Sequence, residues 1–274
     1  MVSKFADDTK IGRTIVDSCD SAKLQKGVDN LVQWCKDWGM SLHPDKCVVL
    51  HFGQKNPRNA YFIGDTKINS ENTARDLGVH ISVDCDSSAH VDKITKMAHG
   101  VLSRIRRATV VRDSHTVKKL YTSFVRPLLE SAAPAWNPHK RMDIEALEKV
   151  QKRSLRMINS LSGMSYEEKL SELNLQSLED RRTRGDMVEL FKYMTNVNKV
   201  DKDELFSFVK DRHEKDTRSR TEDYLVAEKN NLNIRKYFYT NRVTDTWNRL
   251  PKVVKEATSV NNFINKYDEH IKIC

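Results

Sequence analysis

The spacing of apolar residues predicts a mixed α and β region over roughly the first 85 positions. Residues 1–16 have the pattern of a β-hairpin with Asp7-Asp8 at its tip, and residues 47–52 that of a strand. Residues 61–63 and 66–68 flank Gly64-Asp65, a pair suited to a tight hairpin turn. Residues 77–83 predict a further short strand.

One helix is predicted within this region, beginning at Ser21 and ending at Gly39. Its apolar residues recur at helical spacing and are Leu24, Val28, Leu31, Cys35 and Trp38.

From residue 90 onward the strand pattern disappears and helical spacing takes over. Helices are predicted over residues 91–105, over 117–124 with an end near Arg126-Pro127, over 144–161 and over 177–194. Ser165-Tyr-Glu-Glu168 is a capping-box pattern that starts another helix, and a helix at 241–250 ends at Pro251. Residues 210–220 are predicted to be a charged loop. The predicted fold class is therefore α+β, with short strands first and helices afterwards.

The composition indicates a folded chain whose positive charge is unevenly distributed along the sequence. Hydrophobic residues make up 38% of the sequence, which is enough for a core. Lys and Arg exceed Asp and Glu by nine overall, and residues 93–156 alone hold fifteen Lys or Arg against five Asp or Glu. A polyanion such as nucleic acid is the first candidate partner, and a solvated basic surface is the alternative.

Several classes of protein are disfavoured by what the sequence lacks. The five cysteines have no CxxC spacing, which argues against a disulfide framework or a paired zinc knuckle. No apolar run approaches the roughly 20 residues that span a bilayer. We therefore expect an intracellular protein, nuclear or cytoplasmic and not secreted, with no membrane partner. The sequence also has no GxSxG, Walker, GxGxxG or HExxH motif.

The doublet Asp7-Asp8 is the clearest candidate for chemistry. Carboxylates at a strand–turn–strand tip can hold Mg²⁺ or Mn²⁺, which bind one or two protein carboxylates and complete their shell with phosphate and water. Adjacent aspartates are also common in ordinary surface turns, so the doublet gains meaning only from its surroundings.

Those surroundings resemble the palm of reverse transcriptases. Phe5-Ala-Asp-Asp8 resembles the family's aromatic-Ala-Asp-Asp box, and Trp34-Cys-Lys-Asp-Trp38 is similar to the end of the palm helix that follows. His43-Pro-Asp-Lys46-Cys47 looks like the next motif, and Arg75-Asp-Leu-Gly78-Val79 like the Leu-Gly turn of the primer grip. The motifs occur in the order that the family requires.

The likeness continues through the helical part and points to LINE-type, non-LTR retrotransposons of the jockey-like kind. Segments similar to their helical tail are residues 120–130, 136–138, 147–153, 165–170, 178–186 and 247–251. This resemblance implies a partial palm at 1–86, a helical thumb at 87–132 and a helical C-terminal domain at 133–274.

The resemblance also implies roles for individual residues. Asp7 and Asp8 would bind metal, Lys46 would contact phosphate or donate a proton, and Leu77 and Gly78 would seat the primer end. Without the resemblance, Lys46 is an ordinary turn lysine and Leu77-Gly78 a strand entry. The partners would be an RNA template and a DNA primer, gripped by backbone contacts from Arg104, Arg106, Arg107, Arg112, Lys118 and Lys119.

This sequence departs from the family pattern at its N-terminal end. Related enzymes carry fingers and the first half of the palm, with a further metal-binding aspartate, before the hairpin, whereas four residues precede Phe5 here. We therefore expect exposed strand edges, an incomplete core and little polymerase activity, with Mg²⁺ bound only if the palm were complete.

Three hypotheses remain open at this point. The chain is the C-terminal part of an RNA-directed DNA polymerase, a non-catalytic RNA- or DNA-binding protein derived from one, or an inert product. The tryptophans Trp34, Trp38, Trp136 and Trp247 are all expected to be packing residues, and a stacking role for Trp136 is the alternative.

Overall fold

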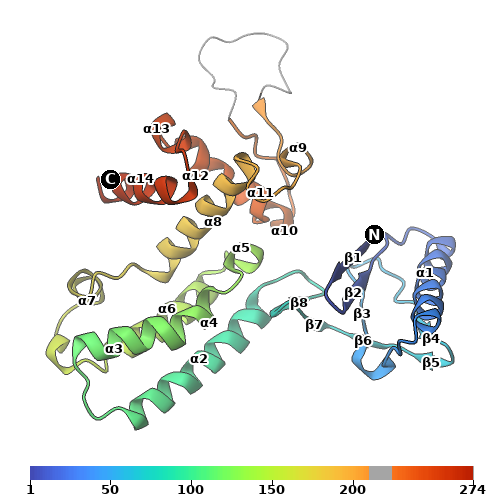
Figure 1. The fold of residues 1–274 in the computed structure, drawn as a ribbon, viewed down its shortest axis with the longest axis horizontal. Coiled ribbons are helices and arrows are strands. Elements are labelled where there is room, and N and C mark those ends of the chain that lie inside the picture. The colour runs from blue at the N-terminus through green and yellow to red at the C-terminus, as the bar shows by residue number, and fades with distance from the viewer. Residues whose placement is uncertain (210–223, 274) are drawn as a thin grey trace. The chain divides into compact units, whose positions relative to one another are not determined.

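A computed structural model describes residues 1–209 and 224–273, so the predicted charged loop at 210–220 lies outside the described residues. The chain divides into two compact units, Met1–Ala89 and His90–Cys274 (Figure 1). The first unit holds the strands, and the second is helical. The general α+β prediction is confirmed. The division expected at 132/133 falls within the second unit and stays a prediction.

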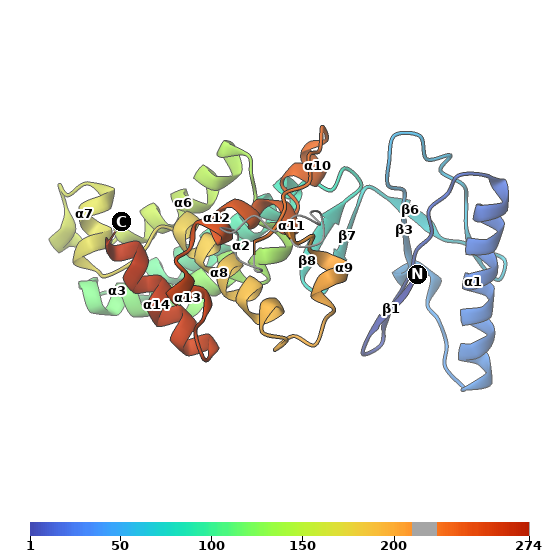
Figure 2. The same ribbon diagram turned by 90° about the horizontal axis from the view of Figure 1, so that it is seen from above.

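The first unit contains four small sheets of two strands each. The hairpin β1 (Val2–Phe5) and β2 (Asp8–Ile11) is antiparallel, and β3 (Val48–Leu50) runs parallel to β6 (Asn69–Glu71). Two further hairpins join β4 (Phe62–Ile63) to β5 (Thr66–Lys67) and β7 (Thr73–Asp76) to β8 (Val79–Ser82). The predicted hairpins are therefore confirmed. Leu77 and Gly78 are not in a strand but form the turn between β7 and β8. Figure 2 shows these two strands side by side.

The helix α1 (Ser18–Asp37) begins three residues before the predicted start. Asp17 is its N-cap, and its side chain accepts a hydrogen bond from the backbone N–H of Asp20. The helix ends as predicted before Gly39, whose φ of +66° suits glycine. Gln25 holds the helix to β4, because its side-chain amide both donates to and accepts from the backbone of Phe62 at 2.9 Å.

The first unit has a thin core, in agreement with the expectation of incomplete packing. Of residues 1–89, all of which the structure describes, only Cys35, Tyr61 and Ile68 are buried hydrophobic side chains. The prediction that Trp34 and Trp38 pack in a core is wrong, because they are 42% and 70% exposed. Helical spacing identifies an apolar face, but it cannot show whether another element covers that face.

The second unit is built from helices of unequal length. The long helices are α2 (Ser88–Ala108), which enters from the first unit, α6 (Arg141–Leu155), α8 (Leu178–Met194) and α14 (Val260–Ile273). The short ones are α3 (Ser114–Leu120), α4 (Arg126–Glu130), α5 (Ala133–Trp136), α7 (Tyr166–Glu172), α9 (Lys202–Leu205), α10 (Asn233–Lys236), α11 (Tyr239–Arg242), α12 (Thr244–Arg249) and α13 (Lys252–Lys255). The helical predictions at 91–105 and 177–194 are confirmed.

The predicted helix end near Arg126-Pro127 is wrong. A π-helical turn at Tyr121–Val125 connects α3 directly to α4, and Pro127 lies in the first turn of α4. Proline is tolerated in a first turn, where its missing N–H has no helical acceptor. The π turn leads into α4, because the N–H of Arg126 bonds to the carbonyl of Tyr121, five residues earlier.

The helix predicted over 144–161 is also shorter than expected. It ends at Leu155, and residues Asn159–Leu161 form a separate 3-10 turn. Ile158 and Leu161 are buried as the apolar spacing requires, although they lie outside the helix. The capping box at Ser165 is confirmed, since its side chain accepts from the Glu168 N–H and Glu168 accepts from the Ser165 N–H.

An aromatic core closes the C-terminal half of the helical unit. Trp247 of α12 and Phe263 of α14 are buried against Leu190 and Phe191 of α8, with the Phe191 and Phe263 rings stacked 4.5 Å apart. The predicted helix at 241–250 corresponds to α11 and α12, and Pro251 follows it as expected. Figure 1 shows α8 running from α7 toward this cluster, so it joins both halves of the unit.

Candidate carboxylate hairpin and nucleic-acid interface

The structure places Asp7 and Asp8 at the tip of a β-hairpin, which we call the carboxylate hairpin (residues 2–11). Phe5 pairs with Asp8, so Ala6 and Asp7 form a two-residue turn. Ala6 has a φ of 51°, a left-handed value that glycine adopts more readily. Both aspartates are exposed, and no hydrogen bond or ion pair engages either side chain within the part of the chain that the structure describes. Their carboxylates are therefore available to an external ligand.

Two side-chain contacts link this hairpin to other elements of the first unit. Lys10 of β2 donates to Asp76 of β7 at 2.6 Å, and the ammonium of Lys4 lies 4.4 Å from the centre of the Trp34 ring of α1. Both contacts are at least partly exposed, so each contributes about 1 kcal/mol or less. The amino group of Met1, which donates to the carbonyl of Gly12 at 2.9 Å, closes the open end of the hairpin itself. The hairpin is therefore positioned mainly by backbone pairing and only weakly by its surroundings.

The other residues assigned to the palm lie on separate elements. Lys46 is the last residue of a 3-10 turn, Pro44–Lys46, and its side chain is exposed. Leu77 and Gly78 occupy the β7–β8 turn with positive φ values of 45° and 89°. Asp76, next to that turn, is the partner of Lys10, so this turn is tied to the carboxylate hairpin. Among the described residues, no hydrogen bond or ion pair links Lys46 to either aspartate.

The carboxylate pair fits a divalent cation only in part. Two adjacent carboxylates supply the hard oxygen ligands that Mg²⁺ prefers, with phosphate and water completing the shell. Over residues 1–209 and 224–273, however, no three His, Cys, Asp or Glu side chains are grouped closely enough to hold a metal. The chain as described therefore offers an open, two-carboxylate site whose remaining ligands must come from elsewhere.

The predicted phosphate-binding cations lie at the end of α2, in the loop that follows it and in the last turn of α3. This region, residues 104–119, is called the basic helical hairpin. Arg104, Arg106, Arg107 and Lys119 are exposed, and Lys118 is half-buried. Within the described residues these five side chains make no ion pair or hydrogen bond. Cations that no carboxylate neutralises are what contact with a phosphate backbone requires.

Arg112 differs from its neighbours. Its guanidinium donates to the carbonyl of Arg106 at 3.1 Å, and thus closes the loop by binding the end of α2. The loop also carries Val110 and Val111, which are 94% and 65% exposed. The geometry therefore gives Arg112 a loop-closing contact, with an apolar tip between the flanking cations.

Several motifs of the helical part form an internal polar cluster, which we call the Asp186 cluster. The Asp186 carboxylate is buried and accepts two hydrogen bonds from Arg242 and one from Asn137, each at 2.9 Å. Asn137 in turn accepts from Arg182 at 3.0 Å, and Tyr239 donates to the Asp186 carbonyl. The cluster joins α8 to α11 and to the segment after α5.

The sequence did not single out Arg242 or Tyr239 for this cluster, because the charge pattern cannot show which charges meet. The expectation that Trp136 packs is confirmed: it is buried, its indole N–H donates to Ser131, and its ring lies 4.8 Å from that of His90. Trp247 is likewise buried.

Comparisons with known proteins give a distant similarity. No protein-family model matches the chain, and no solved structure matches it. A curated protein of Caenorhabditis elegans, described as "Uncharacterized protein B0403.1", is 24% identical over 114 residues, or 40% of this chain and 58% of that protein. The chain thus spans little more than half of that relative's length. Separately, none of the described helices is long and apolar enough to cross a membrane.

Proposed function

We propose that the chain is the C-terminal part of an RNA-directed DNA polymerase of a non-LTR retrotransposon, and that by itself it binds nucleic acid without polymerising. The observation that carries the proposal is the β-hairpin with two exposed aspartates at its turn, followed by a helix, in the order that the reverse-transcriptase motifs require. The unpaired cations of the basic helical hairpin support the nucleic-acid part independently.

In this proposal, different residues bind the metal and contact the nucleic-acid backbone. Asp7 and Asp8 would hold one side of a Mg²⁺-bound nucleotide, with Lys46 close to its phosphates. The basic helical hairpin would contact the sugar–phosphate backbone of an RNA template paired with a DNA primer. A third carboxylate is needed to align two metals for in-line transfer, and the described residues do not group one with Asp7 and Asp8. Binding without catalysis is therefore the activity expected of these 274 residues.

The binding proposal is tested by titrating an RNA–DNA duplex over a range of salt concentrations. The affinity should fall as salt rises, with a slope set by the number of phosphates bound. Arg106→Glu and Arg107→Glu should weaken binding to all sequences and reduce the slope by about one for each phosphate that is no longer bound. Lys96→Glu is the matched control, because it reverses a charge on the same helix at an exposed ion pair outside the basic helical hairpin. Equal losses of affinity in all three variants would refute the proposed interface.

The catalytic part is tested separately by primer extension with an RNA template, deoxynucleotides and Mg²⁺. The chain alone should give no product above that of the Asp7→Ala variant. Extension that Asp7→Ala abolishes would show that the chain polymerises unaided and that our proposal underestimates it. This result would leave the assignment of Asp7 to the metal site intact.

A further inference from the structure

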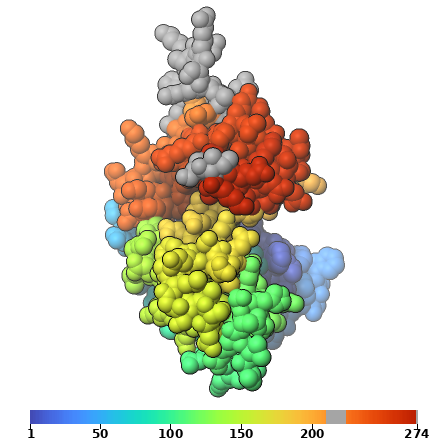
Figure 3. All heavy atoms as spheres, turned by 90° about the vertical axis from the view of Figure 1, so that its left-hand side faces the viewer, coloured from blue at the N-terminus to red at the C-terminus, as the bar shows by residue number. Residues whose placement is uncertain are grey.

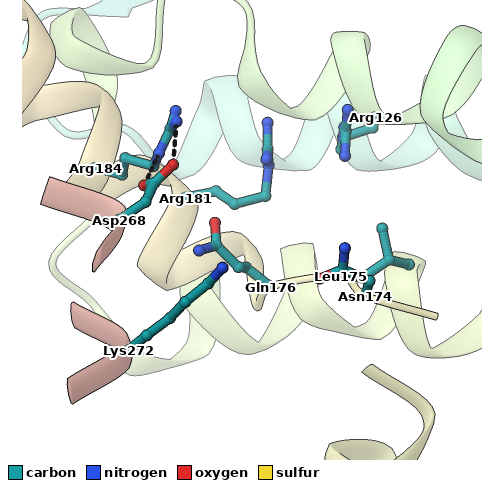
Figure 4. A pocket seen from close by; sticks show the side chains of 8 residues that line it. All are labelled: Arg126, Asn174, Leu175, Gln176, Arg181, Arg184, Asp268 and Lys272. Carbon is teal, nitrogen blue, oxygen red and sulfur yellow. Dashed lines mark hydrogen bonds and ion pairs between the residues drawn. The ribbon is translucent and has the colours of Figure 1, made fainter. Parts of the chain in front are cut away.

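Four positively charged side chains are among the eight residues that line a cavity in the helical unit. It has a volume of about 270 Å³ and lies between α4, α8, α14 and the segment before α8 (Figure 4). Arg126 comes from α4, Arg181 and Arg184 from successive turns of α8, and Lys272 from α14. Gln176 lies among these cations in Figure 4. Residues distant in sequence therefore converge on one concave site within a single compact unit.

The charges around the cavity do not cancel. Glu130 binds Arg181 through two hydrogen bonds and lies 3.8 Å from Arg126, and Asp268 binds Arg184 at 2.6 and 2.8 Å. Two carboxylates thus face four cations, which leaves an excess of two positive charges. The side chains of Glu130 and of the three arginines are only 21–26% exposed. Their partial removal from water strengthens attraction for an anion.

The guanidinium groups also keep unused donors. Arg181 and Arg184 each bind their carboxylate through Nε and one Nη, so the second Nη of each is not spent on that partner. Over the described parts of the chain, neither Arg126 nor Lys272 makes a side-chain hydrogen bond. Fixed guanidinium donors, already oriented by carboxylates, suit the several oxygens of a phosphate group.

We propose that this cavity binds a phosphate monoester or a free phosphate of similar charge. A monoester carries about −1.5 to −2 at pH 7, which matches the excess of two positive charges. The cavity is large enough for a phosphate group but too small for a duplex. The 5′-phosphate at the end of an RNA strand and free inorganic phosphate share this chemistry. Figure 3 shows the C-terminal helices (red) bordering the surface of residues near α7 and α8 (yellow) on this unit.

The site is independent of the duplex-binding surface proposed above, and its experiment uses a different probe. A short single-stranded RNA with a 5′-phosphate is compared with the same RNA ending in a 5′-hydroxyl, by calorimetric titration of the full chain. The phosphorylated strand should bind on the order of tenfold more tightly, as expected for charge-assisted hydrogen bonds. Inorganic phosphate, titrated alone and as a competitor, tells whether a free anion suffices.

Variants then locate the effect. Arg126→Gln and Lys272→Gln should each remove most of the preference for the 5′-phosphate, and Arg126→Gln leaves the Arg181–Glu130 pair intact. Lys266→Gln on α14 and Arg141→Gln on α6 are the controls, because they remove the same charges outside the cavity. Circular dichroism checks that each variant is folded.

The outcomes separate the two proposals. A preference for 5′-phosphate that Arg126→Gln and Lys272→Gln remove supports the cavity, even if duplex binding fails. Binding of inorganic phosphate alone, with the same decrease in these variants, also supports it and identifies a free anion as the ligand. Equal affinity for both RNAs with no binding of inorganic phosphate, or equal effects of cavity and control variants, overturns the proposal.

Discussion

The two units of this chain differ in what their polar and aromatic residues do. Three hydrophobic side chains are buried in residues 1–89, against thirty in the described residues 90–209 and 224–273. In the first unit the distinctive residues, Asp7, Asp8, Trp34 and Trp38, are exposed. In the second, comparable residues such as Asp186 and Trp247 are buried and hold helices together. The distinctive residues are thus open to solvent in the first unit and part of the packing in the second.

This difference has an energetic cause. Each fully buried large apolar side chain contributes about 1.5–3 kcal/mol, so most of the hydrophobic stabilisation belongs to the helical unit. The four small sheets gain little from burial, and isolated two-stranded hairpins are marginally stable in water. We therefore expect the first unit to open at a lower free energy than the second.

The largest effect is expected from truncating a tryptophan in the helical core. Trp247→Ala removes a side chain that is 2% exposed and should reduce the free energy of unfolding of the second unit by about 3–5 kcal/mol. Trp38→Ala is the matched control in the first unit and should change the free energy of unfolding by less than about 0.5 kcal/mol. Denaturant unfolding followed by hydrogen exchange measures both free energies. Equal decreases in the two variants would contradict the difference in stability between the units.

The Asp186 cluster should give the next largest effect. Arg242→Ala leaves the buried Asp186 carboxylate without its two strongest donors and should cost about 3 kcal/mol or more of stability. Arg141→Ala, at an exposed pair with Glu145, should cost about 0.5 kcal/mol or less. Thermal and urea unfolding compare the two. If Arg242→Ala lowers the free energy of unfolding only slightly, water replaces the arginine as the partner of Asp186.

A smaller gain is expected in the carboxylate hairpin. Ala6→Gly relieves a left-handed backbone position and should stabilise the hairpin by about 1 kcal/mol. Ala74→Gly, in β7 with an ordinary backbone conformation, should destabilise its hairpin by about 0.5–1 kcal/mol. Hydrogen exchange of the amides in β2 and β8 measures the opening free energy of each hairpin. If both substitutions destabilise, the turn at Ala6 is not strained.

The smallest effect concerns pH and the cap of α7. The backbone N–H of Ser165 binds the Glu168 carboxylate and holds its pKa below the ordinary value of 4.5. A lowered folded-state pKa stabilises the protein above the unfolded pKa, and this contribution is lost as pH falls through the folded value. The melting temperature of Glu168→Gln should therefore lie slightly below that of the wild type at pH 7, and the difference should shrink as the pH falls from 4.5 through the lowered pKa of Glu168. A gap that persists in acid would contradict a role for the charge.

Local patterns sufficed for much of the fold. The hairpins at Asp7-Asp8 and Gly64-Asp65, the capping box at Ser165 and the helix from Ser177 depend on residues a few positions apart, so the sequence predicted them. The prediction failed at Pro127, because a π turn precedes this proline and carries the helix past it. Tyr121 and Val125 of that turn are fully buried, and burial depends on residues far away in the sequence.

The candidate sites divide in the same way. The exposed cations of the basic helical hairpin were predictable, because an excess of charge within one segment is visible in the sequence. The cavity between α4, α8 and α14 was not, since Arg126 and Lys272 are 146 positions apart and neither belongs to a charge run. Which charges neutralise each other and which remain free depends on the folded neighbours.

The sequence by itself determined the order of elements, the carboxylate doublet at a turn and the location of the positive charge. These follow from short-range spacing, backbone preferences and composition. Only the tertiary structure decided which apolar faces are covered, that Arg242 meets Asp186, and that four cations share one cavity. Burial and charge pairing arise between residues far apart along the chain, and no local pattern specifies them.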